Sequence, residues 1–397
     1  MVFYINPITI MSKEIFPIKA FSGLKTPFYY YDTDLLRKTL QTLTSEAGKY
    51  GFLPHYAIKA NANPVLLKII ASYGLGADCV SGGEVKAALA AGFPAGKIVF
   101  AGVGKADWEI EIGLDNDIFC FNAESLPELD VINEIAARKG KTARVALRVN
   151  PDVDAHTHAK ITTGRQENKF GINAGQVESV IKHIGTLPNV EFIGLHFHIG
   201  SQITEMEVFA TLCERVNGIV SELQSKGVEI KNLNFGGGLG IDYQNPDSHA
   251  IADFSDYFAV FAANIKVAGN PAIHFEPGRS VVAQCGSLVS RVLYVKEGEV
   301  KKFAILDAGF SDLIRPAMYD AYHFMENISS CKAEDKYDVV GPICESSDVF
   351  GKDVVLNGTS RGDFVAIRSA GAYGEVMASQ YNLRELPKAY FSEDLNA

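Results

Sequence analysis

Short apolar runs recur along the first two thirds of the chain, each followed by a segment long enough to hold a helix. The runs are rich in β-branched and aromatic residues, which predicts buried strands. They cover residues 55–59, 77–81, 97–103, 117–122, 144–150, 191–198, 232–236 and 273–276. Between them, apolar residues recur at three- and four-residue spacing, as in 64–72, 83–91 and 126–139, which predicts helices.

Alternation of strands and helices predicts parallel strands joined by helical crossovers. Eight strands favour a closed (β/α)8 barrel over residues 26–276. A doubly wound open sheet is the alternative, because pattern alone does not show whether the sheet closes.

The rhythm changes after residue 276, where apolar runs are separated by short turns and few helical patterns intervene. These runs cover 288–296, 303–307, 337–340, 353–356 and 363–368. They predict a second, mainly antiparallel β domain over 277–397, joined by the N-terminal segment 1–25. The fold class is therefore α/β plus all-β.

Composition narrows the class of protein. The chain has 397 residues, which is too long for one ordinary core, and its net charge of −10 argues against general binding of nucleic acid or anionic lipid. No run of 18 apolar residues occurs, so no membrane span is expected, and the apolar first residues lack the pattern of a signal peptide. The six cysteines are scattered without a CxxC pair, which predicts a reducing, cytoplasmic location.

Candidate chemistry gathers where the predicted strands end, which is the catalytic face of such barrels. Lys59 ends the first strand, where a lysine is either an amine nucleophile or a side chain whose head reaches solvent. Asp78 lies inside the second strand, either as a carboxylate near Lys59 or as a hydrogen-bonding partner within the barrel.

The sixth strand ends in a His-Phe-His sequence followed by a tight turn. Strand periodicity places His196 and His198 on one side, with Ser201 just beyond. One histidine could lie flat on a ring cofactor, the two could ligate a metal, or both could be hydrogen-bonded core residues.

The seventh and eighth strands end in groups suited to an anion and a ring nitrogen. Gly236, Gly237 and Gly238 expose backbone N–H groups without Cβ atoms, as a phosphate cradle or as a simple chain reversal. Glu276 could keep a pyridine nitrogen protonated, and Arg279 could bind a carboxylate or phosphate, unless the two form an internal ion pair. An amine, a ring-facing histidine, a phosphate cradle and a pyridinium partner are together the parts that pyridoxal 5'-phosphate requires.

The chain resembles the pyridoxal-phosphate barrel decarboxylases, and among them the diaminopimelate decarboxylase family, from about Thr26 to Leu386. Six motifs carry the resemblance: 56–61 (YAIKAN), 196–201 (HFHIGS), 236–238 (GGG), 276–279 (EPGR), 344–348 (CESSD) and 370–375 (AGAYGE). The resemblance implies an alanine-racemase-like fold, in which a barrel is followed by a β domain.

Roles follow from the resemblance residue by residue. Lys59 would carry the cofactor and His198 would stack on its ring, while Glu276 would face the ring nitrogen and Asp78 would lie in the cofactor site. The residues implied to hold the phosphate are Ser201, Gly236, Gly237, Gly238 and Tyr373, and Gly278 and Arg279 are further implied cofactor-binding residues. The family is a homodimer with active sites shared across the interface, where Cys344 would return a proton to the substrate. No metal is expected.

The resemblance also implies the substrate, meso-2,6-diaminopimelate, which would be converted to L-lysine and carbon dioxide as the last step of lysine biosynthesis. The implied substrate-binding residues are Arg279, Arg315, Tyr319, Glu345 and Tyr373. Two arginines suit the distal carboxylate and Glu345 suits the distal ammonium.

Three alternatives stay open. A polyamine-pathway decarboxylase acting on ornithine or carboxynorspermidine would share the cofactor. A metal-dependent barrel hydrolase is suggested by the pairs His156/His158 and His196/His198. A non-catalytic pyridoxal-phosphate carrier is the binding-protein alternative, although carriers resemble a lone barrel.

Overall fold

The computed structural model describes residues 15–153 and 169–395, which form two compact units. The barrel unit comprises 38–153, 169–240 and 252–281, and the β unit comprises 15–37, 241–251 and 282–395. The predicted pair His156/His158 lies outside the described residues.

Within the described residues of the barrel unit, eight parallel strands close on themselves. They are β2 (Leu53–Ala57), β3 (Gly76–Cys79), β4 (Ile98–Phe100), β5 (Cys120–Ala123), β6 (Ala143–Asn150), β8 (Val190–His196), β9 (Asn232–Asn234) and β10 (Ala272–Phe275). The order runs β5-β4-β3-β2-β10-β9-β8-β6, and β5 pairs with β6 to complete the ring. A two-residue strand, β7 (Ile172–Asn173), pairs with β6 outside this ring. The predicted barrel is confirmed, and the open sheet is excluded by the β5–β6 pairing.

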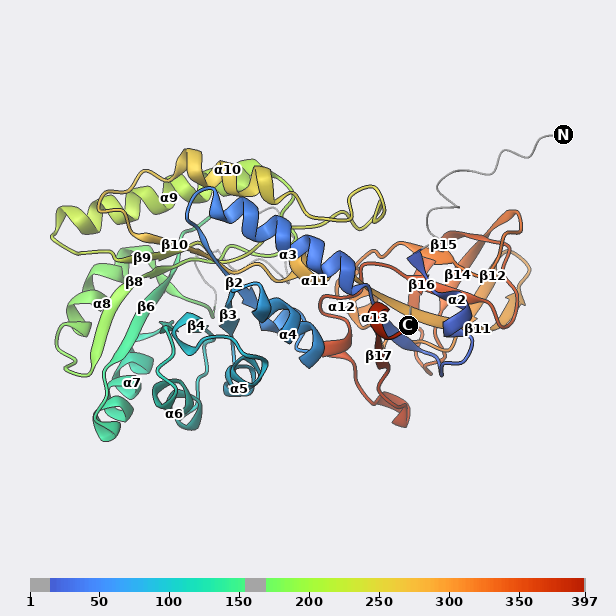
Figure 1. Cartoon of the computed structure of the whole chain (residues 1–397), viewed down its shortest axis with the longest axis horizontal. Coiled ribbons are helices and arrows are strands. Elements are labelled where there is room, and N and C mark those ends of the chain that lie inside the picture. Colours follow the sequence, from blue (N-terminus) through green and yellow to red (C-terminus); the bar gives the residue numbers. More distant parts are fainter. Residues whose placement is uncertain (1–14, 154–168, 396–397) are drawn as a thin grey trace. The chain divides into compact units, whose positions relative to one another are not determined.

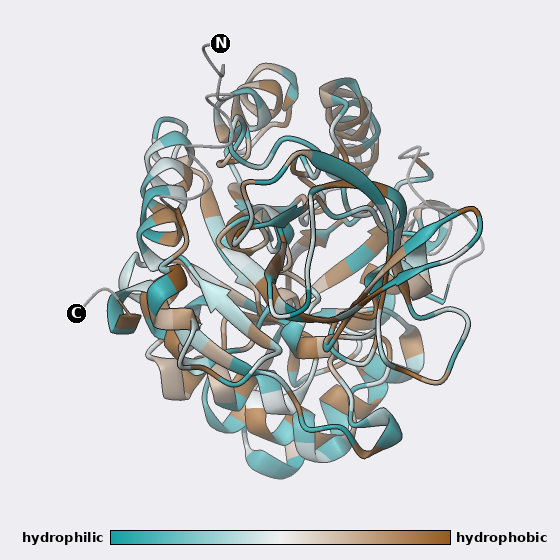
Figure 2. Cartoon of the chain, turned by 90° about the vertical axis from the view of Figure 1, so that its right-hand side faces the viewer, coloured by the Kyte–Doolittle hydropathy of each residue, from teal (hydrophilic) through white to brown (hydrophobic). Residues whose placement is uncertain are grey.

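Helices follow the strands and lie around the outside of the barrel (Figure 1). They are α4 (Pro64–Ser72), α5 (Gly82–Ala91), α6 (Asp107–Asp115), α7 (Leu126–Lys139), α8 (Val177–Ile184), α9 (Met206–Ser225) and α10 (Phe254–Asn264). Figure 2 shows hydrophilic and hydrophobic residues interleaved along the helices, as expected for helices that bury one face.

Local sequence fixes where these helices begin and end. Asn63 and Ser125 cap α4 and α7 by accepting hydrogen bonds from backbone N–H groups of the first turn. Gly92 and Gly140 end α5 and α7 in the left-handed conformation that glycine adopts without strain. Helices α5 and α7 begin at Gly82 and Leu126, directly after β3 and β5 end at Cys79 and Ala123, which leaves short loops at these two strand ends.

Aromatic rings fill the space between the barrel and two of its helices. Phe258 on α10 is fully buried, and its ring packs against Phe52, Phe254, Tyr257 and Phe275 with centroids 5.1–6.4 Å apart. Such packing combines buried area with favourable ring geometry, and Phe258 meets Phe275 edge to face. This cluster fixes α10 against β10, the strand that ends at Glu276.

The β unit contains a sheet of mixed direction that is mainly antiparallel. Its strands are β1 (Phe28–Tyr31), β11 (Gly286–Glu297), β12 (Lys302–Leu306), β13 (Met325–Asn327), β14 (Glu334–Val340), β15 (Val349–Asn357), β16 (Phe364–Ile367) and β17 (Lys388–Phe391). The order is β13-β16-β11-β12-β14-β15, and β1 pairs with β11 and β17. The β12–β14 and β1–β17 pairs are parallel. Short helices α2 (Ile18–Phe21), α12 (Arg315–Tyr319) and α13 (Ser392–Leu395) complete the unit.

The division between the units differs from the expected one at 26–276 and 277–397. Residues 26–37 belong to the β unit because β1 pairs with β11 and β17. Residues 241–251 also belong to it, and Asp247 there forms ion pairs with Arg368 at 2.8 Å. The boundary falls inside α3 (Thr33–Gly48), and α11 (Arg279–Val282) reaches it at residue 281.

None of the helices in 15–153 and 169–395 is long and apolar enough to cross a membrane. All six cysteines are thiols, and four of them are buried.

The aromatic packing makes a prediction about stability. Phe258→Ala removes a fully buried ring and leaves a cavity, so it should lower the free energy of unfolding by about 3–5 kcal/mol. Urea denaturation followed by circular dichroism measures this change. Val131→Ala, on the exposed side of α7, is the control and should stay within about 0.5 kcal/mol of the parent. A loss below about 1 kcal/mol for the Phe258 variant would show that the cluster does not hold α10 in place.

Candidate active site

Lys59 and Asp78 form an ion pair at the carboxyl ends of neighbouring strands. Strand β2 ends at Ala57, so Lys59, which was predicted to end the strand, lies instead in the one-turn helix η1 (Ile58–Ala60) that follows it. Its Nζ is 3.4 Å from Oδ2 of Asp78, and its side chain is 37% exposed against 1% for Asp78. Of the two interpretations of Asp78, the geometry supports the carboxylate near Lys59.

The electrostatics of Asp78 are unusual for a carboxylate. Burial raises the pKa of Asp78 to about 6, and the charge of Glu276 adds to the rise, while Lys59 opposes it. Its Oδ1 is buried and has no hydrogen-bond partner among the described residues. Asp78 is therefore a carboxyl with a raised pKa beside the amine of Lys59.

Glu276, just after β10, is a buried carboxylate held by two donors. His196 Nε2 donates to Oε2 at 2.9 Å, and Asn234 Nδ2 donates to Oε1 at 2.7 Å. Burial favours the neutral form, but the charge and hydrogen bond of His196, with the charge of Lys59, hold the pKa of Glu276 well below its usual range. Glu276 is therefore an ionised carboxylate inside the barrel.

The two histidines of the sixth strand have different partners. His196 binds Glu276, whereas His198 Nδ1 accepts a hydrogen bond from the backbone N–H of Gly237 at 3.4 Å. Burial lowers the pKa of His198 well below its usual range, and the charges of Lys59 and Arg148 lower it further. His198 is thus a neutral ring beside the glycine turn. In 15–153 and 169–395, no group of three or more His, Cys, Asp or Glu side chains is placed to hold a metal ion.

The glycine turn after β9 is packed too tightly for side chains. A Cβ at Gly236 would collide with the carbonyl oxygen of Phe197, and one at Gly237 would collide with that of Glu276. Gly236 and Gly238 also have φ of 70° and 120°, which L residues rarely adopt. The turn is therefore fixed between the ends of β8 and β10.

Arg279 and Ser201 are joined near this turn. Arg279, at the start of α11, donates from Nε and Nη2 to Oγ of Ser201 at 3.2 and 3.0 Å. Gly278 packs against the η1 turn, because a Cβ there would lie 3.0 Å from Cβ of Ala57 and 3.1 Å from Cβ of Ala60. Glycine at 278 thus lets the chain that carries Arg279 pass close to the turn that carries Lys59.

A second buried ion pair near the same strand ends was not predicted from the sequence. Arg148 Nη1 on β6 is 3.1 Å from Oε1 of Glu124, which follows β5. Glu124 also accepts hydrogen bonds from the backbone N–H groups of Gly102 and Gly171, each at 3.0 Å. The signal was present, because Glu124 follows a predicted strand just as Lys59 does. Asn234, which orients Glu276, was likewise missed although it precedes the glycine turn.

The remaining predicted residues lie in the β unit. Arg315 and Tyr319 are in α12, Cys344 and Glu345 follow β14, and Tyr373 follows β16 with φ of 56°. Cys344 is exposed, and its backbone N–H donates to Oδ1 of Asn382 at 3.4 Å. The side chain of Glu345 accepts a hydrogen bond from Tyr381 at 2.8 Å.

Arg315 is buried and braced by two side chains that the sequence gave no reason to single out. Its Nη1 donates to Oη of Tyr243 at 3.0 Å and to Nε2 of His323 at 2.8 Å.

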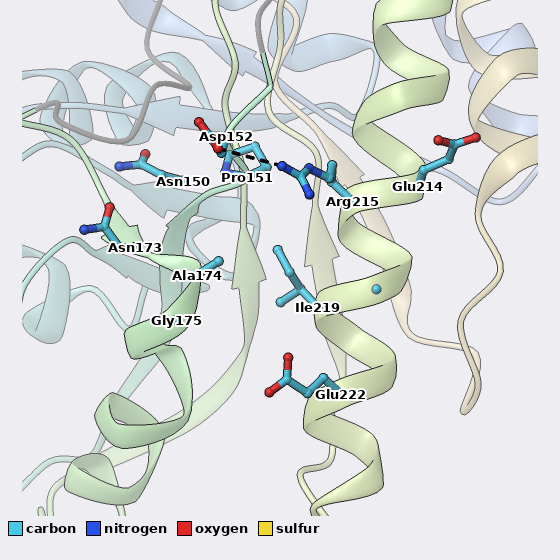
Figure 3. A pocket seen from close by; sticks show the side chains of 11 residues that line it. Asn150, Pro151, Asp152, Asn173, Ala174, Gly175, Glu214, Arg215, Ile219 and Glu222 are labelled. Atoms are coloured by element: carbon cyan, nitrogen blue, oxygen red, sulfur yellow. Dashed lines mark ion pairs between the residues drawn. The ribbon is translucent and has the colours of Figure 1, made fainter.

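A pocket of about 500 Å³ lies between η3 (Ala174–Gln176) and α9 on the barrel unit (Figure 3). Its charged residues include Asp152, Glu214, Arg215 and Glu222, and Asp152 is 3.8 Å from Arg215. None of the predicted site residues lines it.

The strand-end cluster fits pyridoxal phosphate. It combines the Lys59 amine, the ionised Glu276 and a turn of glycines whose packing leaves no room for side chains. Two buried polar atoms, Oδ1 of Asp78 and Nδ1 of His196, have no partner among the described residues, which is expected where a ligand completes a site.

Comparison with known proteins agrees with this assignment. Residues 34–283 match the family described as pyridoxal-dependent decarboxylase, pyridoxal binding domain. The diaminopimelate decarboxylase of Bacteroides thetaiotaomicron is 61% identical over 384 residues, covering 96% of this chain and 100% of that protein. That of Neisseria meningitidis is 44% identical over 366 residues, covering 90% and 87%.

Solved structures are also similar to this chain. Diaminopimelate decarboxylase from Helicobacter pylori, complexed with L-lysine, has a TM-score of 0.90 and 39% identity, covering 95% of this chain and 94% of that one. The chain therefore belongs to the diaminopimelate decarboxylase family of pyridoxal-dependent decarboxylases.

Proposed function

We propose that this chain is a carboxy-lyase that converts meso-2,6-diaminopimelate to L-lysine and carbon dioxide, the last step of lysine biosynthesis. One observation carries the proposal. An amine, an ionised carboxylate and a glycine turn meet at the catalytic end of the barrel, in a chain 61% identical to a diaminopimelate decarboxylase. A polyamine substrate is not favoured by the relatives.

Pyridoxal phosphate, when bound, accepts the electron pair that remains on the substrate carbon after the carboxylate leaves. Lys59 would hold this cofactor through its amine, and Glu276 would keep the ring nitrogen protonated. The glycine turn, Ser201 and Arg279 would bind the phosphate, and His198 would lie against the ring. Tyr373 is proposed as a further phosphate ligand.

The neutral state of His198 is suited to this role. A protonated ring would add a cation beside Lys59 and Arg148, whose charges already disfavour it. Asp78 has a raised pKa and lies beside Lys59, so it is placed to exchange a proton with that amine. The strand ends therefore supply both a fixed charge at Glu276 and a movable proton at Asp78.

The distal end of the substrate carries a carboxylate and an ammonium. We assign the carboxylate to Arg279 and Arg315, and the ammonium to Glu345, with Tyr319 and Tyr373 as further contacts. Cys344 is proposed to return a proton to the carbon that loses carbon dioxide. These roles rest on the family motif and on the burial and bracing of Arg315.

We also propose a cytoplasmic homodimer with shared active sites. The segment that contacts Cys344 and Glu345 exposes Val376, Leu383 and Leu386, with Leu383 97% exposed. Neighbouring exposed apolar side chains are typical of a surface that a partner covers. The free thiols fit a reducing compartment.

Lys59→Ala should abolish the cofactor-derived visible absorbance and lower kcat/KM on meso-diaminopimelate by about a thousandfold or more, because it removes the amine that lies against Asp78. Absorbance of the purified protein and release of carbon dioxide measure the two effects. Lys68→Ala, on the exposed face of α4, should change neither. Full activity of the Lys59 variant would refute the cofactor assignment.

Glu276→Gln should lower kcat by about 10²–10³-fold while the protein still binds the cofactor. Glutamine removes the negative charge, and its NH2 group would face one of the two donors that Glu276 now accepts from, His196 or Asn234. Steady-state kinetics and cofactor content are the measurements. The control is Glu222→Gln, which alters an exposed carboxylate on α9. An unchanged kcat would contradict a role for this charge.

Arg315→Ala should lower kcat/KM on meso-diaminopimelate, because the distal carboxylate loses a charged partner. The expected loss of transition-state stabilisation is about 2–5 kcal/mol. Arg315→Lys should restore little, since lysine lacks the planar fork. The assay measures lysine formation, with ornithine as a competing substrate and Arg361→Ala, an exposed arginine, as the control. An unaffected specificity constant for the alanine variant would rule out the assignment of Arg315.

A further inference from the structure

We infer that His323 and Tyr243 are positioning residues, which orient Arg315 toward the distal carboxylate of the substrate. The inference rests on the proposed function, because it concerns how that carboxylate is recognised. All three residues lie in the β unit, so it depends only on contacts within that unit.

The two contacts occupy one nitrogen of the guanidinium. Nη1 of Arg315 carries two hydrogens, and it donates to Oη of Tyr243 at 3.0 Å and to Nε2 of His323 at 2.8 Å. These two acceptors therefore take up both hydrogens of Nη1 and fix the plane in which the guanidinium lies. Tyr243 and His323 thus set the orientation of the guanidinium of Arg315.

The tautomer of His323 is fixed by its other nitrogen. Nδ1 lies 2.9 Å from the backbone carbonyl oxygen of Arg368, which only accepts, so Nδ1 must carry the proton. Nε2 of a neutral ring then has a lone pair directed at Arg315. A doubly protonated ring would lose this acceptor and place a second cation against the guanidinium.

The residues that hold Arg315 are themselves anchored to the sheet. The backbone N–H of Arg368 donates to the carbonyl of Phe324, which follows His323, at 2.8 Å. The Arg368 side chain forms ion pairs with Glu326 at 2.6 Å and with Asp247 at 2.8 Å. Asp247 belongs to the same segment, 241–251, as Tyr243. One arginine thus ties down both the carbonyl that fixes His323 and the segment that supplies Tyr243.

Ring contacts hold the three groups in register. The rings of Tyr243 and His323 meet edge to face, with centroids 5.2 Å apart and an interplanar angle of 80°. The guanidinium carbon of Arg315 is 5.0 Å from the Tyr243 ring centroid. His323 is fully buried, so its ring has little freedom to turn away. The side chain of Arg315 therefore approaches its ligand already oriented, which limits the entropy lost on binding.

Two substitutions separate this role from a merely structural one. His323→Gln places an amide oxygen near the position of Nε2 and can still accept from Arg315. His323→Asn places an amide nitrogen near the position of Nδ1 and can still donate to the Arg368 carbonyl, but its acceptor no longer reaches Arg315. A structural role for His323 predicts that the asparagine variant is the better tolerated, whereas a positioning role predicts the opposite.

The test measures KM and kcat for meso-diaminopimelate and the dissociation constant of L-lysine by calorimetry, on the cofactor-loaded full chain. His323→Asn should raise KM and the L-lysine dissociation constant about 10- to 100-fold, with kcat within about threefold of the parent. His323→Gln should recover most of the lost affinity. Tyr243→Phe, which keeps the ring and removes the acceptor, should raise KM about tenfold. His183→Asn, on the outside of the barrel unit, is the matched control and should behave as the parent.

The outcomes separate a failure of the proposed function from a failure of this inference. If the parent protein releases no carbon dioxide from meso-diaminopimelate, the proposed function fails and this inference with it. If the parent is active but His323→Asn leaves KM and L-lysine affinity unchanged, the inference alone is overturned. It is also overturned if glutamine and asparagine are equally damaging, or if the loss appears in kcat rather than in KM.

Discussion

An ionised carboxylate inside an apolar barrel is the constraint on which the rest of the site depends. Burial of Glu276 would by itself favour the protonated form, and the charge and hydrogen bond of His196, with the charge of Lys59, reverse that preference. Asn234 also donates to Glu276, and the two donors come from β8 and β9, so the position of this charge requires β8, β9 and β10 to pair in the correct register. The fold and the chemistry are linked at this residue.

The fixed charge of Glu276 has a consequence for its neighbour. Burial raises the pKa of Asp78 to about 6, and the negative charge of Glu276 adds to the rise. Two carboxylates within one barrel end are thereby driven toward different protonation states, an arrangement that separates a permanent charge from a group able to exchange a proton. Lys59, next to Asp78, is the group that such an exchange would serve.

Much of the fold was predictable from the sequence, and the parts that were not predicted have physical causes. All eight barrel strands were predicted because parallel strands are buried on both faces and read as apolar runs, and the predicted helices 64–72 and 126–139 match α4 and α7. The membership of 26–37 in the β unit was not predictable, because β1 pairs with β11 more than 250 residues later in the chain. Segment 241–251 carries no strand or helix pattern, so its ion pair with Arg368 left no trace in the periodicity.

The two histidines of the His-Phe-His sequence differ in a way that the sequence pattern does not predict. Alternation along a strand predicts that His196 and His198 share a side, but it does not say that one would bind a carboxylate and the other a glycine N–H. The difference arises because β8 ends at His196, so His198 already belongs to the loop. Asp78 and Lys59 were likewise assignable to one end of the barrel, yet their 3.4 Å separation depends on the η1 turn that follows β2.

A neutral imidazole beside a cation occurs in both units. Burial lowers the pKa of His198, the charges of Lys59 and Arg148 lower it further, and its ring accepts a hydrogen bond from Gly237. His323 receives a hydrogen bond from Arg315 while its other nitrogen donates to a backbone carbonyl. In each case the neighbouring cation disfavours protonation of the ring, and the neutral ring offers a lone pair that a protonated one would lack. A protein that binds an anionic cofactor and a substrate with carboxylates at both ends must concentrate cations. Neutral histidines orient those cations and their surroundings without adding further charge, which explains why histidine serves here as an acceptor.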